Sequence, residues 1–122
     1  EIASNGGGLM DTPQVTMKRL TARMNGLLDE FERLGITAAE AEYTYKCAEA
    51  KKTLILRDEG YPATLIQNLV KGDDEVAKLR LARDTAEVRY RGAQERINAV
   101  KKEIAILADE INREWGNAKY GG

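Results

Sequence analysis

Two apolar stripes of nearly equal length flank residues 60–72, and they constrain the fold more than any other feature. In both stripes the apolar positions recur at alternating steps of three and four residues, which is the spacing of helices that pack lengthwise on one another. The first stripe comprises Leu20, Met24, Leu27, Phe31, Leu34, Ala38, Ala41, Tyr45, Ala48, Lys52 and Ile55; the second comprises Val76, Leu79, Arg83, Ala86, Tyr90, Ala93, Ile97, Val100, Ile104, Leu107, Ile111 and Trp115. The pattern predicts an all-α fold: a long antiparallel helical hairpin, coiled-coil-like, with a short connecting helix and completed by self-association.

Capping residues set the predicted helix boundaries. Thr12 is a suitable N-cap before Pro13, and Gly60 and Pro62 mark the end of the first long helix. Asp73 follows Gly72 and is a suitable N-cap for the second long helix. We expect a single hairpin domain over residues 13–116, with helices at 13–59, 62–71 and 73–115, a stop at Gly116-Asn117, and flexible tails at 1–12 and 117–122.

Gly35 leaves two interpretations of the first long helix. Thr37 and Glu40 have the spacing of a capping box, which would restart a helix after a stop at the glycine. The apolar stripe, however, keeps its phase from Phe31 across to Ala38, and an interior glycine costs only about 1 kcal/mol. The sequence therefore favours one continuous helix, straight or kinked at Gly35.

Folding the stripes onto each other about the connector predicts a register. It places Leu20 against Trp115, Phe31 against Ile104, Ala41 against Ala93, Tyr45 against Tyr90 and Ala48 against Ala86. The only charged members of the stripes, Lys52 and Arg83, fall in one layer. Their side chains are expected to reach past the seam to Asp84, Glu49 or solvent.

Both helices carry a second apolar edge, which indicates a further binding partner because a hairpin alone does not bury it. The edge comprises Ile36, Tyr43, Cys47, Ala50 and Leu54 on the first helix and Leu81, Val88 and Gly92 on the second. The connecting helix, which is expected to turn Leu65, Ile66, Leu69 and Val70 inward, a second copy, or a foreign protein could cover this edge. The candidate partner-binding residues are Tyr61, Leu65, Ile66, Asn68, Lys71, Tyr43, Leu54, Leu81 and Val88.

The residues of catalysis and metal binding are scarce. The chain has no histidine and a single cysteine, Cys47, which the pattern places in mid-helix. These features argue against common acid–base, nucleophilic and zinc sites, so we expect a non-enzymatic protein with no metal and no cofactor. Nineteen basic and twenty acidic residues nearly cancel, and no run is long enough to cross a bilayer. The expected location is the cytoplasm.

Arginines crowd the second long helix and suggest a nucleic-acid surface as an alternative. The candidate residues are Arg80, Arg83, Arg89, Tyr90, Arg91 and Arg96, with the tyrosine available to stack on a base. Acidic residues are interleaved with them, and Glu87 and Arg91 have the spacing of an ordinary helix ion pair. A solvated face of mixed charge explains the same pattern.

Over residues 48–103 the chain resembles a group of small helical proteins encoded by phages and prophages of Gram-positive bacteria. The points of likeness are AKK at residues 50–52, EGYPATLI at 59–66, KGD at 71–73, EVA at 75–77, RD at 83–84, AEV at 86–88, and Tyr90. The resemblance carries no catalytic signature. It implies a phage setting, in which small proteins often assist recombination and replication or block a host defence nuclease.

The expected function is therefore that of a phage accessory protein that binds itself and another protein. An inhibitor of a host defence enzyme, anti-CRISPR-like, is one form of this function. A DNA-binding helper of phage recombination or replication and a structural coiled-coil component of a virion or its assembly scaffold are the alternatives.

Overall fold

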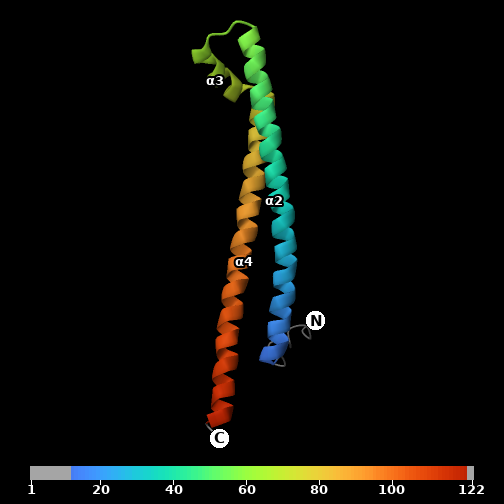
Figure 1. The fold of residues 1–122 in the computed structure, drawn as a ribbon, viewed down its shortest axis with the longest axis vertical. Helices are drawn as coiled ribbons and strands as arrows, with labels where there is room; N and C mark the ends of the chain where they lie inside the picture. The colour runs from blue at the N-terminus through green and yellow to red at the C-terminus, as the bar shows by residue number, and fades with distance from the viewer. Residues whose placement is uncertain (1–11, 121–122) are drawn as a thin grey trace, which may run out of the picture. The chain divides into compact units, whose positions relative to one another are not determined.

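The computed structural model describes residues 12–120, with side chains up to Asn117, and in this part it contains three helices and no strand. They are α2 (Pro13–Asp58), α3 (Ala63–Gly72) and α4 (Asp74–Tyr120) (Figure 1). The predicted all-α helical hairpin is confirmed: two long antiparallel helices are connected through one short helix. Most of the predicted N-terminal tail, residues 1–11, and the last two residues of the C-terminal tail lie outside the described residues.

The helix boundaries follow from capping chemistry. The backbone N–H of Val15 donates to Oγ1 of Thr12 at 3.2 Å, and that of Val76 donates to Oδ2 of Asp73 at 3.1 Å. At the end of α2, Gly60 has a φ of 90°, the left-handed conformation that glycine adopts without strain. Hydrogen bonds from the N–H groups of Gly60 and Tyr61 to the carbonyls of Arg57 and Leu56 complete a Schellman stop. All three predicted caps are confirmed.

Two glycines lie inside continuous helices, and at Gly35 this confirms the favoured prediction of one uninterrupted helix. At Gly35 α2 is continuous, and Thr37 donates its hydroxyl to the carbonyl of Arg33 at 3.1 Å rather than starting a new helix. At the other end, α4 continues through Gly116 and Asn117 to Tyr120, so the predicted stop and the start of the C-terminal tail are wrong. A glycine alone costs a helix about 1 kcal/mol, and no proline follows to enforce an end.

The chain divides into two compact units. The connector unit is Phe31–Ala93 and contains α3; the terminal unit consists of residues up to 30 and from 94 onward. In the connector unit α3 packs into a core formed by Tyr45, Leu56, Ile66, Val70 and Val76.

Leu56 is buried in this core, whereas Ile55, the predicted stripe residue, is about half exposed. The last turns of α2 pack against α3 rather than continuing along α4, which rotates the buried face by one residue.

The register within the connector unit differs from the predicted one by about ten residues. Tyr90, which was predicted to lie against Tyr45, stacks on Phe31. Lys52, which was predicted to share a layer with Arg83, pairs with Asp73 at 3.3 Å. The pairing of Lys52 with Asp73 sets the N-cap of α4 beside α2 more than one turn before the end of α2. The prediction assumed that the end of α2 and the start of α4 lie side by side. Instead, α2 extends beyond the start of α4, and α3 packs beside the last turns of α2.

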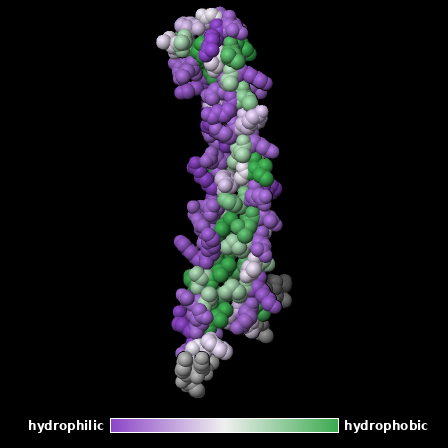
Figure 2. Space-filling view, in the orientation of Figure 1, coloured by the Kyte–Doolittle hydropathy of each residue, from purple (hydrophilic) through white to green (hydrophobic). Residues whose placement is uncertain are grey.

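In the terminal unit two helices pack with no third helix among the described residues. Ile97 and Val100, both on α4, are its buried hydrophobic side chains in residues 12–117, and Arg96 pairs with Glu30 at 3.4 Å. Hydrophobic residues remain visible where the helices meet, with hydrophilic residues on both borders (Figure 2). Trp115, predicted to complete the stripe, is 70% exposed.

None of the helices in the described part of the chain has the length and apolarity of a membrane span.

Candidate protein-binding surfaces

An exposed apolar row runs along α2 in the connector unit. Residues 36, 43, 47, 50 and 54 recur at steps of three, four or seven and so share one face of the helix. This face lies roughly half a turn from the seam residues Tyr45 and Lys52 and so points away from α4. Tyr43 is 71% exposed and Leu54 is 56% exposed. We call these five residues the outer row.

The connecting helix covers little of the outer row. Ile66 and Val70 of α3 are buried, as predicted, but Leu65 and Leu69 are exposed rather than turned inward. Of the candidate partner-binding residues near α3, Ile66 is therefore unavailable because it belongs to the core. The exposed candidates are Tyr61, Leu65, Asn68 and Lys71.

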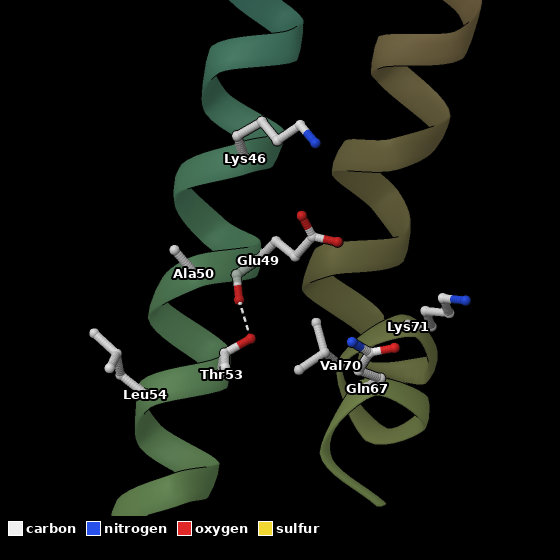
Figure 3. A pocket seen from close by; sticks show the side chains of 8 residues that line it. All are labelled: Lys46, Glu49, Ala50, Thr53, Leu54, Gln67, Val70 and Lys71. Atoms are coloured by element: carbon white, nitrogen blue, oxygen red, sulfur yellow. Dashed lines mark hydrogen bonds between the residues drawn. The ribbon is translucent and has the colours of Figure 1, made fainter. Parts of the chain in front are cut away.

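A groove of about 680 Å³ separates α2 from α3 and ends at the outer row. Lys46, Glu49, Ala50, Thr53 and Leu54 line it from α2, and Gln67, Val70 and Lys71 from α3. Figure 3 shows Val70 directed toward α2, while Ala50 and Leu54 occupy the side of α2 that faces away from α3. The hydroxyl of Thr53 donates to the carbonyl of Glu49 at 2.8 Å and leaves its methyl group for the groove.

A second groove, of about 640 Å³, lies on the other flank of the outer row, between α2 and the first turns of α4. Tyr43 and Cys47 line it, together with Lys51, Asp73 and Val76. A hydrogen bond with the Cys47 side chain raises the pKa of Tyr43 above its ordinary value of 10.0. From Tyr43 to Leu54 the outer row is thus a ridge between two grooves.

A third groove, of about 480 Å³, lies further along α2 and α4 and has a basic rim. Leu34, Thr37, Ala82, Thr85 and Ala86 form its small or aliphatic lining. Leu81, a candidate partner-binding residue that is 67% exposed, lines it as well, together with the cations Arg33, Lys78 and Arg89. Val88, the remaining candidate, is 66% exposed, and its spacing of seven from Leu81 sets it on the same face of α4.

The candidate nucleic-acid residues are mostly engaged within the protein. Arg91 pairs with Glu87 at 3.0 Å, as predicted, and Arg96 pairs with Glu30. Arg80 donates to the carbonyl of Lys71 at 3.1 Å and so ties α4 to the end of α3. Arg89 lines the third groove.

Tyr90 does not offer a free ring to a base. Its ring is half-buried and stacks on Phe31 with centroids 4.7 Å apart and an interplanar angle of 20°. In this structure the stacking partner of Tyr90 is Phe31.

Arg83 is held from three sides. It donates to Asp84 at 2.9 Å, lies 3.8 Å from a carboxylate oxygen of Glu42, and covers the ring of Tyr45 at 4.4 Å from the centroid. The hydrogen bond with Asp84 is the main reason why the pKa of Arg83 is raised. The expectation that Arg83 reaches Asp84 is confirmed, whereas Lys52 reaches Asp73 rather than Glu49 or solvent alone.

Asp73 is the acidic residue with a clear structural role. The N–H of Val76 lowers the pKa of Asp73 below its ordinary value of 3.8, and Lys52 lowers it further. This is the capping role that the sequence predicts for Asp73. Among the described residues, no group of three or more His, Cys, Asp or Glu side chains is arranged to hold a metal ion.

Sequence reasoning missed the third groove and its rim. Arg33 and Lys78 were not candidate residues, because each lies on an unremarkable charged stretch of its own helix. The signal was the set of small residues that line the groove, Thr37 on α2 and Ala82, Thr85 and Ala86 on α4. Comparisons with protein-family models, curated proteins and solved structures found no match for this chain.

Proposed function

We propose that this protein is a non-enzymatic phage accessory protein that acts in the bacterial cytoplasm by binding another protein through its connector unit. The observation that carries the proposal is the outer row of α2, in which the side chains of Ile36, Tyr43 and Leu54 are each more than half exposed. Exposed Tyr43 and Leu54 are of the kinds of side chain that anchor protein interfaces, since they bury large apolar area on binding.

The two grooves beside the outer row support the same proposal. A partner side chain that enters the groove between α2 and α3 meets Thr53 and Val70, with the charged groups of Lys46, Glu49 and Lys71 at the border, and Ala50 and Leu54 lie where the groove reaches the outer row. An apolar centre with a polar border is the usual anatomy of a protein interface. The exposed face of α3, with Leu65 and Lys71, extends the surface available to the partner.

The phage setting and the class of partner rest on the resemblance over residues 48–103. That resemblance includes the EGYPATLI segment, which contains the turn before α3 and its first residues. In a phage setting, a small protein with an exposed apolar ridge is suited to inhibit a host defence enzyme by covering a functional surface of it. The partner is accordingly proposed to be such an enzyme.

Affinity capture with the tagged full chain, from lysates of a phage-infected Gram-positive host, tests the proposal. The test compares the native chain with Tyr43→Ser/Leu54→Ser, and with a control, Lys101→Ser/Lys102→Ser, that changes two exposed residues of the terminal unit. We expect a host protein that the native chain and the control retain and that the outer-row variant retains at least tenfold less. Recovery of nothing but the chain itself, or equal recovery by all three, would contradict the proposal.

A further inference from the structure

The third groove and a smaller groove in the terminal unit are lined by side chains of opposite charge. The groove, within the connector unit, is lined by Arg33, Lys78 and Arg89 and by no acidic residue. In the terminal unit a smaller groove of about 260 Å³ is lined by Thr16, Leu20, Glu103, Ile106, Leu107 and Glu110, with two carboxylates and no basic residue. We refer to these as the basic groove and the acidic groove.

Each groove also exposes a large aliphatic side chain. Leu81 in the basic groove is 67% exposed, and Ile106 in the acidic groove is 61% exposed. Burying a leucine or isoleucine side chain is favourable, so both grooves gain from an apolar partner. The two grooves are complementary in charge and alike in apolar content.

The terminal unit has a particular need for a partner. In its described residues the buried hydrophobic side chains are Ile97 and Val100 of α4, and its part of α2 buries none. The connector unit, in contrast, has α3 as a third helix that completes its core. Helices draw most of their stability from tertiary packing, so a two-helix layer of this kind gains from another helical layer.

We propose that the protein forms a homodimer in which the acidic groove of one copy docks on the basic groove of the second copy. Ile106 of one chain then packs near Leu81 of the other, and Glu103 and Glu110 meet the cations Lys78 and Arg89. This dimer does not rest on the proposed function, because the outer row takes no part in it.

Lys78 and Arg89 can each pair with a carboxylate of the second chain. Lys78 lies 3.3 Å from Asp74, but both side chains are highly exposed, so that pair contributes little and is readily exchanged. The side chain of Arg89 has Thr85, Ala86, Gly92 and Ala93 as its neighbours three and four residues away on α4. A carboxylate from a second chain therefore meets no competing acid at these four positions.

Charge reversal and rescue test the dimer. Light scattering after size exclusion measures the native full chain, Lys78→Glu/Arg89→Glu, Glu103→Lys/Glu110→Lys and the control Lys101→Glu, whose neighbours three and four residues away on α4 are uncharged. We expect the native chain and the control at twice the chain mass of 13.5 kDa, and each double variant with at least tenfold weaker self-association at unchanged helical content.

Mixing the two double variants is the decisive experiment. The reversed groove of each variant is complementary in charge to the reversed groove of the other, and the two unchanged grooves are also complementary. Native mass spectrometry should then show a heterodimer that contains one chain of each variant, which a variant that merely failed to fold would not form. A native chain that stays at single-chain mass, a dimer unaffected by both reversals, or a mixture that stays monomeric would overturn the proposal. So would single-chain mass together with single-stranded DNA bound at the basic groove.

Discussion

Tyr90 of α4 lies directly against Gly35 of α2: a Cβ atom built on the glycine would stand 2.9 Å from Cε1 of the ring. The same ring also stacks on Phe31, which restricts how far it can move away from Gly35. Gly35 therefore serves close packing of the two long helices rather than a break in α2. This contact also explains why the apolar pattern keeps its phase across the glycine.

Replacing Gly35 should destabilise the protein although alanine is the better helix former. Gly35→Ala gains about 1 kcal/mol in helix propensity, but overpacking against a held ring costs about 1–3 kcal/mol. The matched control is Gly26→Ala, where a Cβ meets nothing within 4 Å and should stabilise by about 0.5–1 kcal/mol. Urea unfolding at one fixed protein concentration measures both.

A double-mutant cycle isolates the contact. In a Tyr90→Ala background the ring is gone, so Gly35→Ala should become neutral or stabilising. Equal stabilisation by Gly35→Ala and Gly26→Ala in the native background would show that the ring does not restrict position 35.

Arg83 and Arg91 offer a matched comparison of two arginines on one helix. Arg83→Lys loses the planar group that lies over Tyr45 and donates to Asp84, and it should cost about 1 kcal/mol. Arg91→Lys changes an exposed pair with Glu87 and should stay within about 0.5 kcal/mol. Thermal unfolding of the two variants under one set of conditions checks the difference, and equal effects would contradict the account of Arg83.

Asp73 should make stability depend on pH in the acid range. Its pKa in the folded protein lies below the ordinary value of 3.8, so the folded state favours the carboxylate. The stabilisation is present above the ordinary value and disappears as the pH falls through the lower, folded value. The Tm advantage of the native chain over Asp73→Ala should therefore shrink on acidification.

Asp73→Asn separates the cap from the charge. Asparagine can still accept the N–H of Val76, but it does not attract Lys52. It should be more stable than Asp73→Ala near neutral pH and show a weaker dependence on acid pH than the native chain. A native advantage over Asp73→Ala that is constant down to pH values well below 3.8 would contradict this role.

The sequence predicted the helices and their ends better than it predicted which residues of the helices pack against each other. Caps at Thr12, Gly60 and Asp73 depend on nearest neighbours, and all are found where local chemistry puts them. The register depends on how far α3 folds back beside α2, which no local pattern encodes, and the predicted pairing of Tyr45 with Tyr90 failed for this reason. The same fold-back makes Leu56 a core residue in place of Ile55.

The candidate surfaces divide in the same way. Tyr43, Leu54, Leu81 and Val88 could be recognised because their spacing sets them off the seam, and they are exposed. The exposure of Leu65 and Leu69 could not be predicted, because it depends on the side from which α3 meets α2. The basic groove needs two helices in the correct register before Arg33 and Arg89 border one surface.

The most direct test of the proposed function is a photo-crosslink from position 54 in infected host cells. A photo-reactive amino acid replaces Leu54 in the full chain, and a matched chain carries it at Lys101 of the terminal unit. The account predicts an adduct between position 54 and a host protein that is absent from the Lys101 chain. No adduct at position 54 other than with the chain itself, or the same host adducts from both positions, would contradict it.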